Sequence, residues 1–358
     1  MWRATAHVGA VRAVVVAPRG GAFLSCGERS VKRWALEVRR TATFEGGGEA
    51  DDCVEPTGTW TSGATLNDVD ASWSADVFVT ASSEGAVEVW DMERLQKPTR
   101  RWSWGSDAMY KARWNPAECH VIASCGRDRA LTLYDSRQAT PLRKLVLATR
   151  ANALAWNPRD PNCIVVGCED GKCLLFDVRT LAKPKMIYDD HVDAVTDLAF
   201  APSGREFATA SADRTTRIFP VRGAGAGRSR ECYHTSRMQK IAAVRFTADA
   251  SFVVTGSDDA NVRVWKAAAS KKLGPVTSRE QASLDYRKTL VERFQHMPEV
   301  RRIAKQRNVP KMVKKLKLRQ AETRDKERAK MSNRITHSKP GSNAPKAART
   351  KAVISEIE

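Results

Sequence analysis

The densest group of reactive side chains in this sequence is formed by Asp189, Asp190, His191 and Asp193. Carboxylates and imidazoles bind metal ions and act as general acids and bases, so this group could be a metal or catalytic site. Alternatively, His191 is a structural residue that opens a repeated unit, and its acidic neighbours lie in a loop. The repeat described below favours the structural alternative.

Other chemistry-bearing patterns are missing from the sequence. The eight cysteines form no CxxC pair, and the sequence contains no GxxxxGK[ST], HExxH or GxSxG motif. No apolar run approaches the roughly 18 residues of a membrane span. We therefore expect a protein that is not an enzyme, with no metal, no cofactor, no small-molecule substrate and no membrane partner.

The positive charge is concentrated near the C-terminus. The chain has a formal net charge of +19, and residues 266–358 contain 25 Lys/Arg and 9 Asp/Glu, a net of +16. An almost neutral body with a basic tail predicts an acidic polymer as partner, most often a nucleic acid. A merely solubilising surface is the alternative, although such a surface normally mixes both signs.

Six segments share one pattern: a small residue, an acid two places later and an aromatic residue six places after the acid. The acids are Glu28, Glu84, Asp128, Asp170, Asp213 and Asp259, and the aromatic residues are Trp34, Trp90, Tyr134, Phe176, Phe219 and Trp265. The aromatic residues are 56, 44, 42, 43 and 46 residues apart, which is the period of a four-stranded propeller blade apart from the first interval.

This spacing predicts where each residue of the pattern lies. The acid belongs in a tight turn, where a short carboxylate bonds the local backbone, and the aromatic residue packs between blades from the next strand. The long first interval contains EGGGEADDCVEPTGT at 45–59, which predicts a mobile surface loop. We expect an all-β propeller over 1–268.

At these residues the chain resembles the WD-repeat family. Trp90-Asp91 is the literal WD dipeptide, and Tyr134-Asp135 and Phe176-Asp177 are near variants. The family also has a histidine at the start of a blade that completes a buried hydrogen-bond network. His7, His191 and His234 match that position.

After the last repeat the pattern becomes helical. Thr277 and Glu280, or Ser278 and Gln281, offer a capping box that places a helix start near Ser278. Tyr286, Leu290, Phe294 and Met297 then form one apolar face, which we expect to pack on the propeller or on a partner. Pro298 and Pro310 suit the first turns of two more helices. We expect a helical domain over 269–336 and a tail over 337–358 that is disordered alone.

Nine basic residues and no acid lie between 301 and 319. They are the candidate RNA-binding residues Arg301, Arg302, Lys305, Arg307, Lys311, Lys314, Lys315, Lys317 and Arg319. Their charge predicts contacts with RNA phosphates that are partly independent of RNA sequence. An acidic protein surface or a nuclear import receptor is the competing partner.

The tail segments SREQASLDY, FQHMPEVRRIAKQRNVPK and NRITHSKPGS resemble the C-terminal signature of Sof-type WD-repeat proteins. That resemblance implies a scaffold of the small-subunit processome in the nucleolus. It also implies pre-rRNA and box C/D small nucleolar RNP proteins as partners. The family's propeller has seven blades after an N-terminal extension, whereas six repeats are visible here. The first blade is therefore expected to be missing, through an alternative start or a partial gene model.

The sequences at the ends of two blades are compatible with a second function. Many WD-repeat substrate receptors of cullin-RING ubiquitin ligases dock their adaptor through an aromatic-Asp-x-Arg sequence. Asp135 with Arg137, and Asp177 with Arg179, match it. The alternative is that each Asp and Arg only stabilises a turn.

Overall fold

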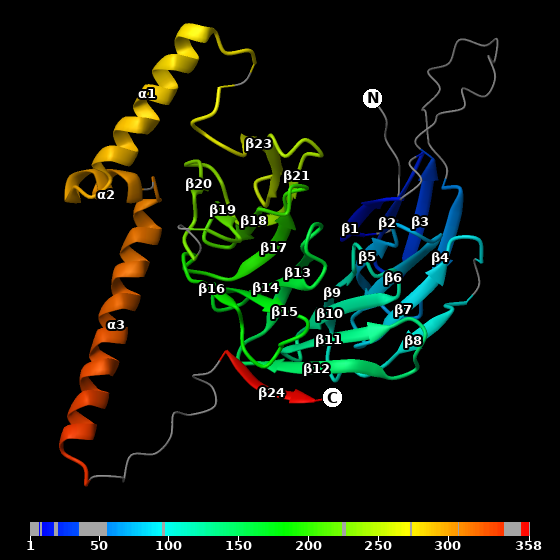
Figure 1. Cartoon of the computed structure of the whole chain (residues 1–358). Coiled ribbons are helices and arrows are strands. Elements are labelled where there is room, and N and C mark those ends of the chain that lie inside the picture. The colour runs from blue at the N-terminus through cyan, green and yellow to red at the C-terminus, as the bar shows by residue number, and fades with distance from the viewer. Residues whose placement is uncertain are drawn as a thin grey trace.

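The computed structural model describes residues 7, 9–17, 21–35, 56–94, 97–223, 227–272, 274–306, 308–339 and 352–357. Six antiparallel sheets are arranged about a common centre as the blades of a β-propeller, and three helices follow at its side (Figure 1). This architecture confirms the fold predicted from the repeat. Most of the predicted loop at 45–59 and the segment before His7 lie outside the described residues.

Each blade takes consecutive strands, innermost first. Blades 1 to 3 contain β1 (Ala13–Val16), β2 (Ala22–Cys26), β3 (Ser30–Ala35), β4 (Gly58–Thr61); β5 (Leu66–Ala71), β6 (Val77–Ser82), β7 (Val87–Asp91), β8 (Arg100–Trp102); and β9 (Met109–Trp114), β10 (Val121–Gly126), β11 (Ala130–Asp135), β12 (Pro141–Leu147). Blades 4 to 6 contain β13 (Ala151–Trp156), β14 (Cys163–Cys168), β15 (Cys173–Asp177), β16 (Met186–Tyr188); β17 (Val195–Phe200), β18 (Glu206–Ser211), β19 (Thr216–Pro220), β20 (Glu231–Tyr233); and β21 (Ile241–Phe246), β22 (Phe252–Ser257), β23 (Asn261–Lys266).

The six repeated aromatic residues occupy equivalent positions on the third strand of each blade. Each lies opposite an apolar residue of the second strand, as in the pairs Trp90 with Phe78 and Phe219 with Phe207. The same register pairs Trp34 with Phe23, Tyr134 with Ile122, Phe176 with Ile164 and Trp265 with Val253. The repeat in the sequence is therefore a repeat of strand register.

The turns between the second and third strands follow the predicted chemistry where the acid is aspartate. The Asp128 and Asp213 carboxylates accept hydrogen bonds from backbone nitrogens two residues later, at 3.0 and 2.9 Å. The residue directly after each aspartate adopts a positive φ, which is 62° at Arg129 and 65° at Arg214. Among the described contacts the longer Glu84 makes no such bond; its carboxylate instead lies 3.6 Å from Arg101.

Five apolar clusters hold the blades together, and each joins two neighbouring blades. Phe176 packs against blade 3, for example, and Phe219 packs against blade 4. Because an internal blade lies between two others, its third strand is buried on both faces rather than on one, as in β7 and β15. Burial of apolar side chains between neighbouring blades is the main source of stability.

The first and last blades differ from the others. Val14 and Val16 of β1 are 54% and 62% exposed, and Val262 and Val264 of β23 are 73% and 62% exposed. Inner strands pack in the order β1, β5, β9, β13, β17 and β21, and within the described residues no comparable packing joins β21 back to β1. Among the described residues, no blade packs on the side of blade 1 before β1 or on the side of blade 6 after β23.

The helices begin close to the predicted positions. They are α1 (Ser278–Phe294), α2 (Pro298–Lys305) and α3 (Lys311–Thr336). Thr277 and Glu280 form the capping box of α1, and Pro298 is the first residue of α2. Pro310 is not in the first turn of α3 but directly precedes it as the N-cap. None of the described helices is both long and apolar enough to cross a bilayer.

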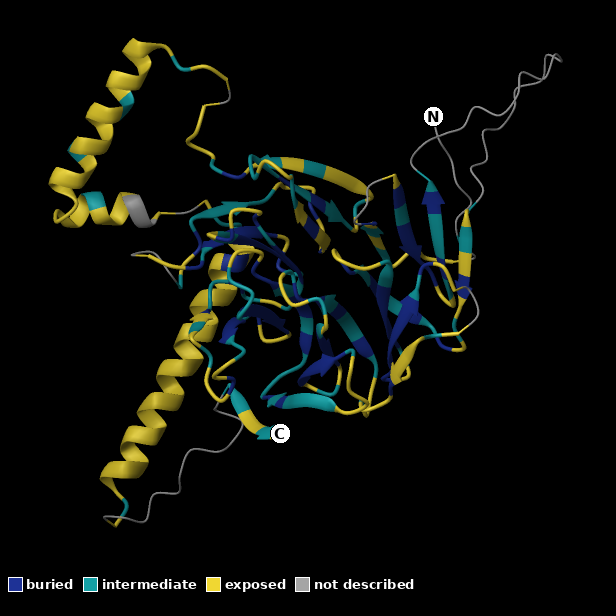
Figure 2. Ribbon diagram, turned by 45° about the vertical axis from the view of Figure 1, so that its right-hand side comes forward, coloured by how far each residue is buried: buried dark blue, intermediate teal, exposed yellow. Residues whose placement is uncertain are grey.

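The apolar face of α1 does not pack on the propeller. No residue of α1 is buried, and Tyr286 and Phe294 remain 66% and 38% exposed (Figure 2). Of the two alternatives drawn from the sequence, packing on the propeller is therefore wrong, and packing on a partner stays a prediction.

The C-terminal segment is not wholly without structure. Residues 353–357 form β24 (Val353–Ile357), which pairs antiparallel with β12 as a fifth strand of blade 3. The polar, Pro/Gly/Ala-rich composition of this segment predicts that it is disordered alone. The free outer edge of β12 supplies a partner for the backbone groups of residues 353–357.

Candidate functional site

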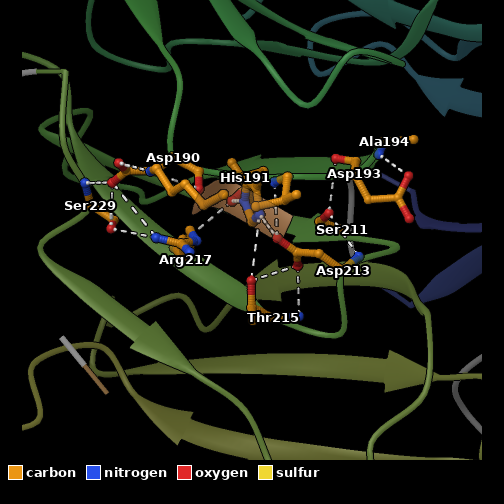
Figure 3. A network of polar contacts seen from close by, with 12 residues as sticks. Asp190, His191, Asp193, Ala194, Ser211, Asp213, Thr215, Arg217 and Ser229 are labelled. Atoms are coloured by element: carbon orange, nitrogen blue, oxygen red, sulfur yellow. Dashed lines mark hydrogen bonds and ion pairs between the residues drawn. The ribbon is translucent and has the colours of Figure 1, made fainter. Parts of the chain in front are cut away.

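The acidic group around His191 is held by a buried network at the start of blade 5 (Figure 3). The His191 Nδ1 lies 3.0 Å from the Asp213 carboxylate, and its Nε2 bonds the Thr209 hydroxyl. Thr215 donates to the same carboxylate from its backbone nitrogen and its hydroxyl, at 2.9 and 2.6 Å. Burial disfavours the charged Asp213, but His191, Thr215 and Arg217 outweigh that effect and lower its pKa.

A related network forms in blade 1. The His7 Nε2 lies 2.8 Å from the Ser25 hydroxyl, which also accepts a bond from the Trp34 indole at 2.8 Å. His234, the third matching histidine, differs because its buried Nε2 has no hydrogen-bond partner within the described residues. In blade 6 the Trp265 indole donates to the Thr255 hydroxyl at 2.9 Å.

Asp190, next to His191, links blade 5 to the helical tail. Its carboxylate accepts bonds from the Ser229 backbone nitrogen and hydroxyl, both at 2.7 Å, and lies 3.7 Å from Arg217. Burial acts against the charged form, but these partners and Lys317 outweigh it and lower the pKa of Asp190. An anchored, ionised carboxylate at the propeller surface is a ready contact for a cation.

Helix α3 docks on this loop. The Lys317 Nζ lies 3.4 Å from Asp190, and Arg324 lies 3.3 Å from Asp189. Gln320 donates to the backbone oxygen of Val192 at 3.3 Å, and Val313 is buried at 3% exposure. The acidic loop therefore holds the tail, a role that sequence reasoning missed because the partners are more than 120 residues apart.

The structure separates the nine candidate RNA-binding residues into groups. Arg301 and Arg302 lie exposed on α2, and the Arg301 side chain donates to the backbone oxygen of Gln295 at 3.1 Å. Lys317 faces Asp190, whereas Lys311, Lys314, Lys315 and Arg319 are exposed on other parts of α3. Arg307 lies outside the described residues, as does the side chain of Lys305.

A charged network on the inner strands was also missed by the sequence reasoning. Asp68 of β5 is fully buried and lies 2.9 Å from Arg113 of β9, while Asp197 of β17 lies 2.8 Å from Arg245 of β21. Lys111 bridges Asp68 and Asp197 at 3.4 and 3.9 Å. Burial opposes ionisation of Asp197, but Arg245 and Lys111 outweigh it and lower its pKa. The available signal was the presence of charged residues in the inner strands β5, β9 and β17.

The two candidate adaptor-docking sites have different geometry. In blade 3 the Arg137 guanidinium is held by its own Asp135, with an Nη2 to Oδ2 distance of 2.8 Å. In blade 4 the Asp177 carboxylate accepts only the backbone nitrogen of Arg179, at 3.1 Å, and lies 3.8 Å from Lys185. The exposed Arg179 guanidinium has no ion pair within the described residues.

The described cysteines are free thiols, of which Cys119 and Cys232 are partly buried and the other five are buried. Burial raises the pKa of Cys163 to about 11 and that of Cys168 to about 12, so both thiols are protonated at neutral pH. In the part of the chain that the structure describes, no group of three or more His, Cys, Asp or Glu could hold a metal ion.

Comparison with known proteins gives two family matches. The family model of the Sof1-like domain matches residues 267–353, and that of the WD domain, G-beta repeat, matches residues 182–219 and 230–266.

Three relatives illustrate the similarity along the whole chain. The chain is 39% identical to "DDB1- and CUL4-associated factor 13" of Xenopus laevis over 99% of this chain and 76% of that protein. The human protein of the same name shows the same identity and the same coverage. The chain is 35% identical to "Protein SOF1" of Saccharomyces cerevisiae over 82% of this chain and 59% of that protein.

Proposed function

Because this chain belongs to the Sof1-like family of WD-repeat proteins, we propose that it is a non-enzymatic scaffold of the small-subunit processome. In this role it serves pre-rRNA processing and biogenesis of the 40S ribosomal subunit. The propeller binds protein partners, including box C/D small nucleolar RNP proteins, and the basic tail binds pre-rRNA.

One observation carries the RNA part of this proposal. Helix α3 leaves the propeller with most of its cations exposed, since Lys317 and Arg324 are the two that meet propeller acids within the described residues. Cations without nearby carboxylates are available to neutralise phosphates, which dominate affinity for nucleic acids. The similarity to Protein SOF1 supports the assignment.

The scaffold proposal is tested by purifying the tagged chain from cells and identifying the bound RNA and proteins. Pre-rRNA together with a box C/D small nucleolar RNP is the expected result. A chain lacking 266–358 should lose the RNA but keep part of the protein set. Recovery of neither RNA nor processome proteins with the full chain would contradict the proposal.

The same role implies residence in the nucleus, mainly the nucleolus. Import would use the basic residues between Lys311 and Arg319, and retention would come from nascent pre-rRNA. Imaging a tagged chain without 266–358 should show less nucleolar signal than the full chain. An undiminished signal would count against the tail as the retaining element.

A second candidate function is substrate reception for a cullin-RING ubiquitin ligase. It is favoured by the printed name of the vertebrate relatives, which associates those proteins with DDB1 and CUL4. The exposed Arg179 is the better placed docking residue here, since Arg137 is held by Asp135. Arg179→Ala should abolish recovery of an adaptor and a cullin, whereas Arg137→Ala should weaken it less. Recovery of adaptor and cullin that is undiminished in both variants would exclude these docking sites.

A further inference from the structure

The docking of α3 decides which side of this helix faces the propeller. Val313, Lys317, Gln320 and Arg324 make the contacts, and they are separated by four, three and four residues. With 3.6 residues per turn, this spacing defines a single side of the helix. The opposite side therefore faces away from the propeller, where a large ligand can reach it.

Five cations lie on that opposite side: Lys311, Lys315, Arg319, Lys326 and Lys330, here called the basic stripe. Every one is exposed, and none makes an ion pair with another described residue. Glu322 is the acid that shares this side of the helix. The stripe differs from the stretch 301–319 singled out in the sequence, because it omits Lys314 and Lys317 and continues along α3 beyond Arg319 to Lys330.

The geometry of the stripe suits a rigid line of negative charges. Residues four apart on a helix are about 6 Å apart along the axis, and Lys311 to Lys330 span about 28 Å. Helix α3 contains no Phe, Tyr or Trp that could stack on an unpaired base. Charge without stacking platforms favours the backbone of paired RNA over single strands.

We infer that the basic stripe of α3 binds the phosphate backbone of a base-paired RNA segment while the opposite side of the helix stays docked on Asp189 and Asp190. This inference rests on the proposed function and names the surface and the form of RNA that the tail uses. The acidic loop then acts as a positioning device that aims the stripe away from the propeller.

Two matched variants of the full chain test the stripe. The first replaces three stripe cations, Lys315→Gln, Arg319→Gln and Lys326→Gln. The control replaces three exposed cations of the same helix that lie off the stripe, Lys314→Gln, Arg328→Gln and Arg334→Gln. Both remove three charges from α3, and circular dichroism checks that each variant keeps its helix content.

Binding is measured against salt with an RNA duplex of about 20 base pairs, a uridine oligomer of equal length and polyglutamate. We expect the stripe variant to bind the duplex about tenfold more weakly and to lose about 2 to 3 units of the log–log salt slope. The control should lose less than one unit. The unsubstituted chain should prefer the duplex to both other polymers.

The outcomes separate this inference from the proposed function. Equal losses in the two variants, or preference for the uridine oligomer, would overturn the stripe while leaving RNA binding intact. An unsubstituted chain that binds none of the RNA probes would overturn both proposals. Stripe-dependent binding of polyglutamate as tight as that of the duplex would assign the surface to an acidic protein and overturn the inference.

Discussion

At the scale of single residues, the repeated aromatic positions are equivalent in register but not in burial. Phe219 is fully buried between blades 4 and 5, where it stacks on Phe207 with ring centroids 5.4 Å apart. Trp265 holds the same register position in blade 6, yet it is only partly buried because none of the described blades covers the outer side of β23. The energetic role of a repeated register position thus depends on the blades that neighbour it.

Truncation of the two aromatic residues should reveal this difference. Phe219→Ala is expected to lower the free energy of unfolding by about 3–5 kcal/mol, as for a buried aromatic side chain cut to Ala. Trp265→Ala should cost clearly less, because its side chain transfers less area from water. Urea unfolding of both variants measures the difference; equal losses would show that blade 6 is covered in solution.

The Asp213 carboxylate makes the free energy of unfolding depend on pH in the acidic range. Its pKa is lowered in the folded chain because the charges and bonds of His191, Thr215 and Arg217 exceed the cost of burial. A lowered folded pKa means that the stabilisation is present above the ordinary pKa of about 3.9 and is lost as pH falls below it. The folded chain should therefore weaken steeply between about pH 5 and pH 2.

Asp213→Asn should remove part of this dependence. At pH 7 the variant is expected to lose roughly 1–3 kcal/mol of unfolding free energy, the range for a disrupted buried hydrogen bond to a charged group. Its loss of stability below pH 5 should be shallower than that of the unsubstituted chain. The control is Asp325→Asn, where the Asp325 side chain is 74% exposed. It should change neither the unfolding free energy at pH 7 nor the loss of stability below pH 5. A variant with an unchanged acid profile would exclude Asp213 as the titrating group.

At the scale of elements, the outer edge of blade 3 accepts an added strand. The register pairs Lys144 with Ile357 and Val146 with Ser355, and Arg143 lies 3.7 Å from Glu356. Val353 also packs against the apolar cluster shared by blades 3 and 4. Backbone pairing along one edge with one apolar anchor is the pattern by which sheets bind extended peptides.

A chain ending at residue 351 should leave this edge open. A labelled peptide covering 350–358 is expected to bind the truncated chain but not the full one, where the tail already occupies β12. Fluorescence anisotropy measures this, with a peptide of scrambled order as control. Equal binding of both peptides, or of the native peptide to both chains, would contradict pairing at this edge.

At the scale of the whole molecule, stability should be unevenly distributed around the ring. Blades 2 to 5 are covered on both sides, whereas the outer sides of blades 1 and 6 expose Val14, Val16, Val262 and Val264. Regions with fewer buried apolar contacts open at lower free-energy cost. The strands of blades 1 and 6 are therefore expected to open first.

Amide hydrogen exchange of the intact chain checks this gradient. The amides of β14 and β15 should exchange most slowly and those of β22 and β23 faster by about tenfold or more, which corresponds to about 1.4 kcal/mol or more in opening free energy. Protection of β22 and β23 equal to that of β14 and β15 would mean that another chain or copy covers blade 6 under the conditions used.

Local patterns in the sequence were sufficient to predict the blades and the approximate starts of the helices. The acid-to-aromatic spacing reports a turn and a strand register, which are set within about ten residues, and the capping box at Thr277 and Glu280 is equally local. The basic character of the tail is likewise a property of composition. These features depend on neighbours along the chain, so one sequence reveals them.

Contacts between distant segments were decided only by the tertiary structure. Asp190 meets Lys317, and β24 meets β12, across long stretches of chain, and no repeat in the sequence relates these partners to each other. Val262 is exposed and Trp265 is only partly buried because no blade of the described residues packs on β23, whereas their own pattern matches that of the buried repeats. Side-chain type and spacing specify what a residue can contact; the packing of the blades and of α3 determines which partner is within reach.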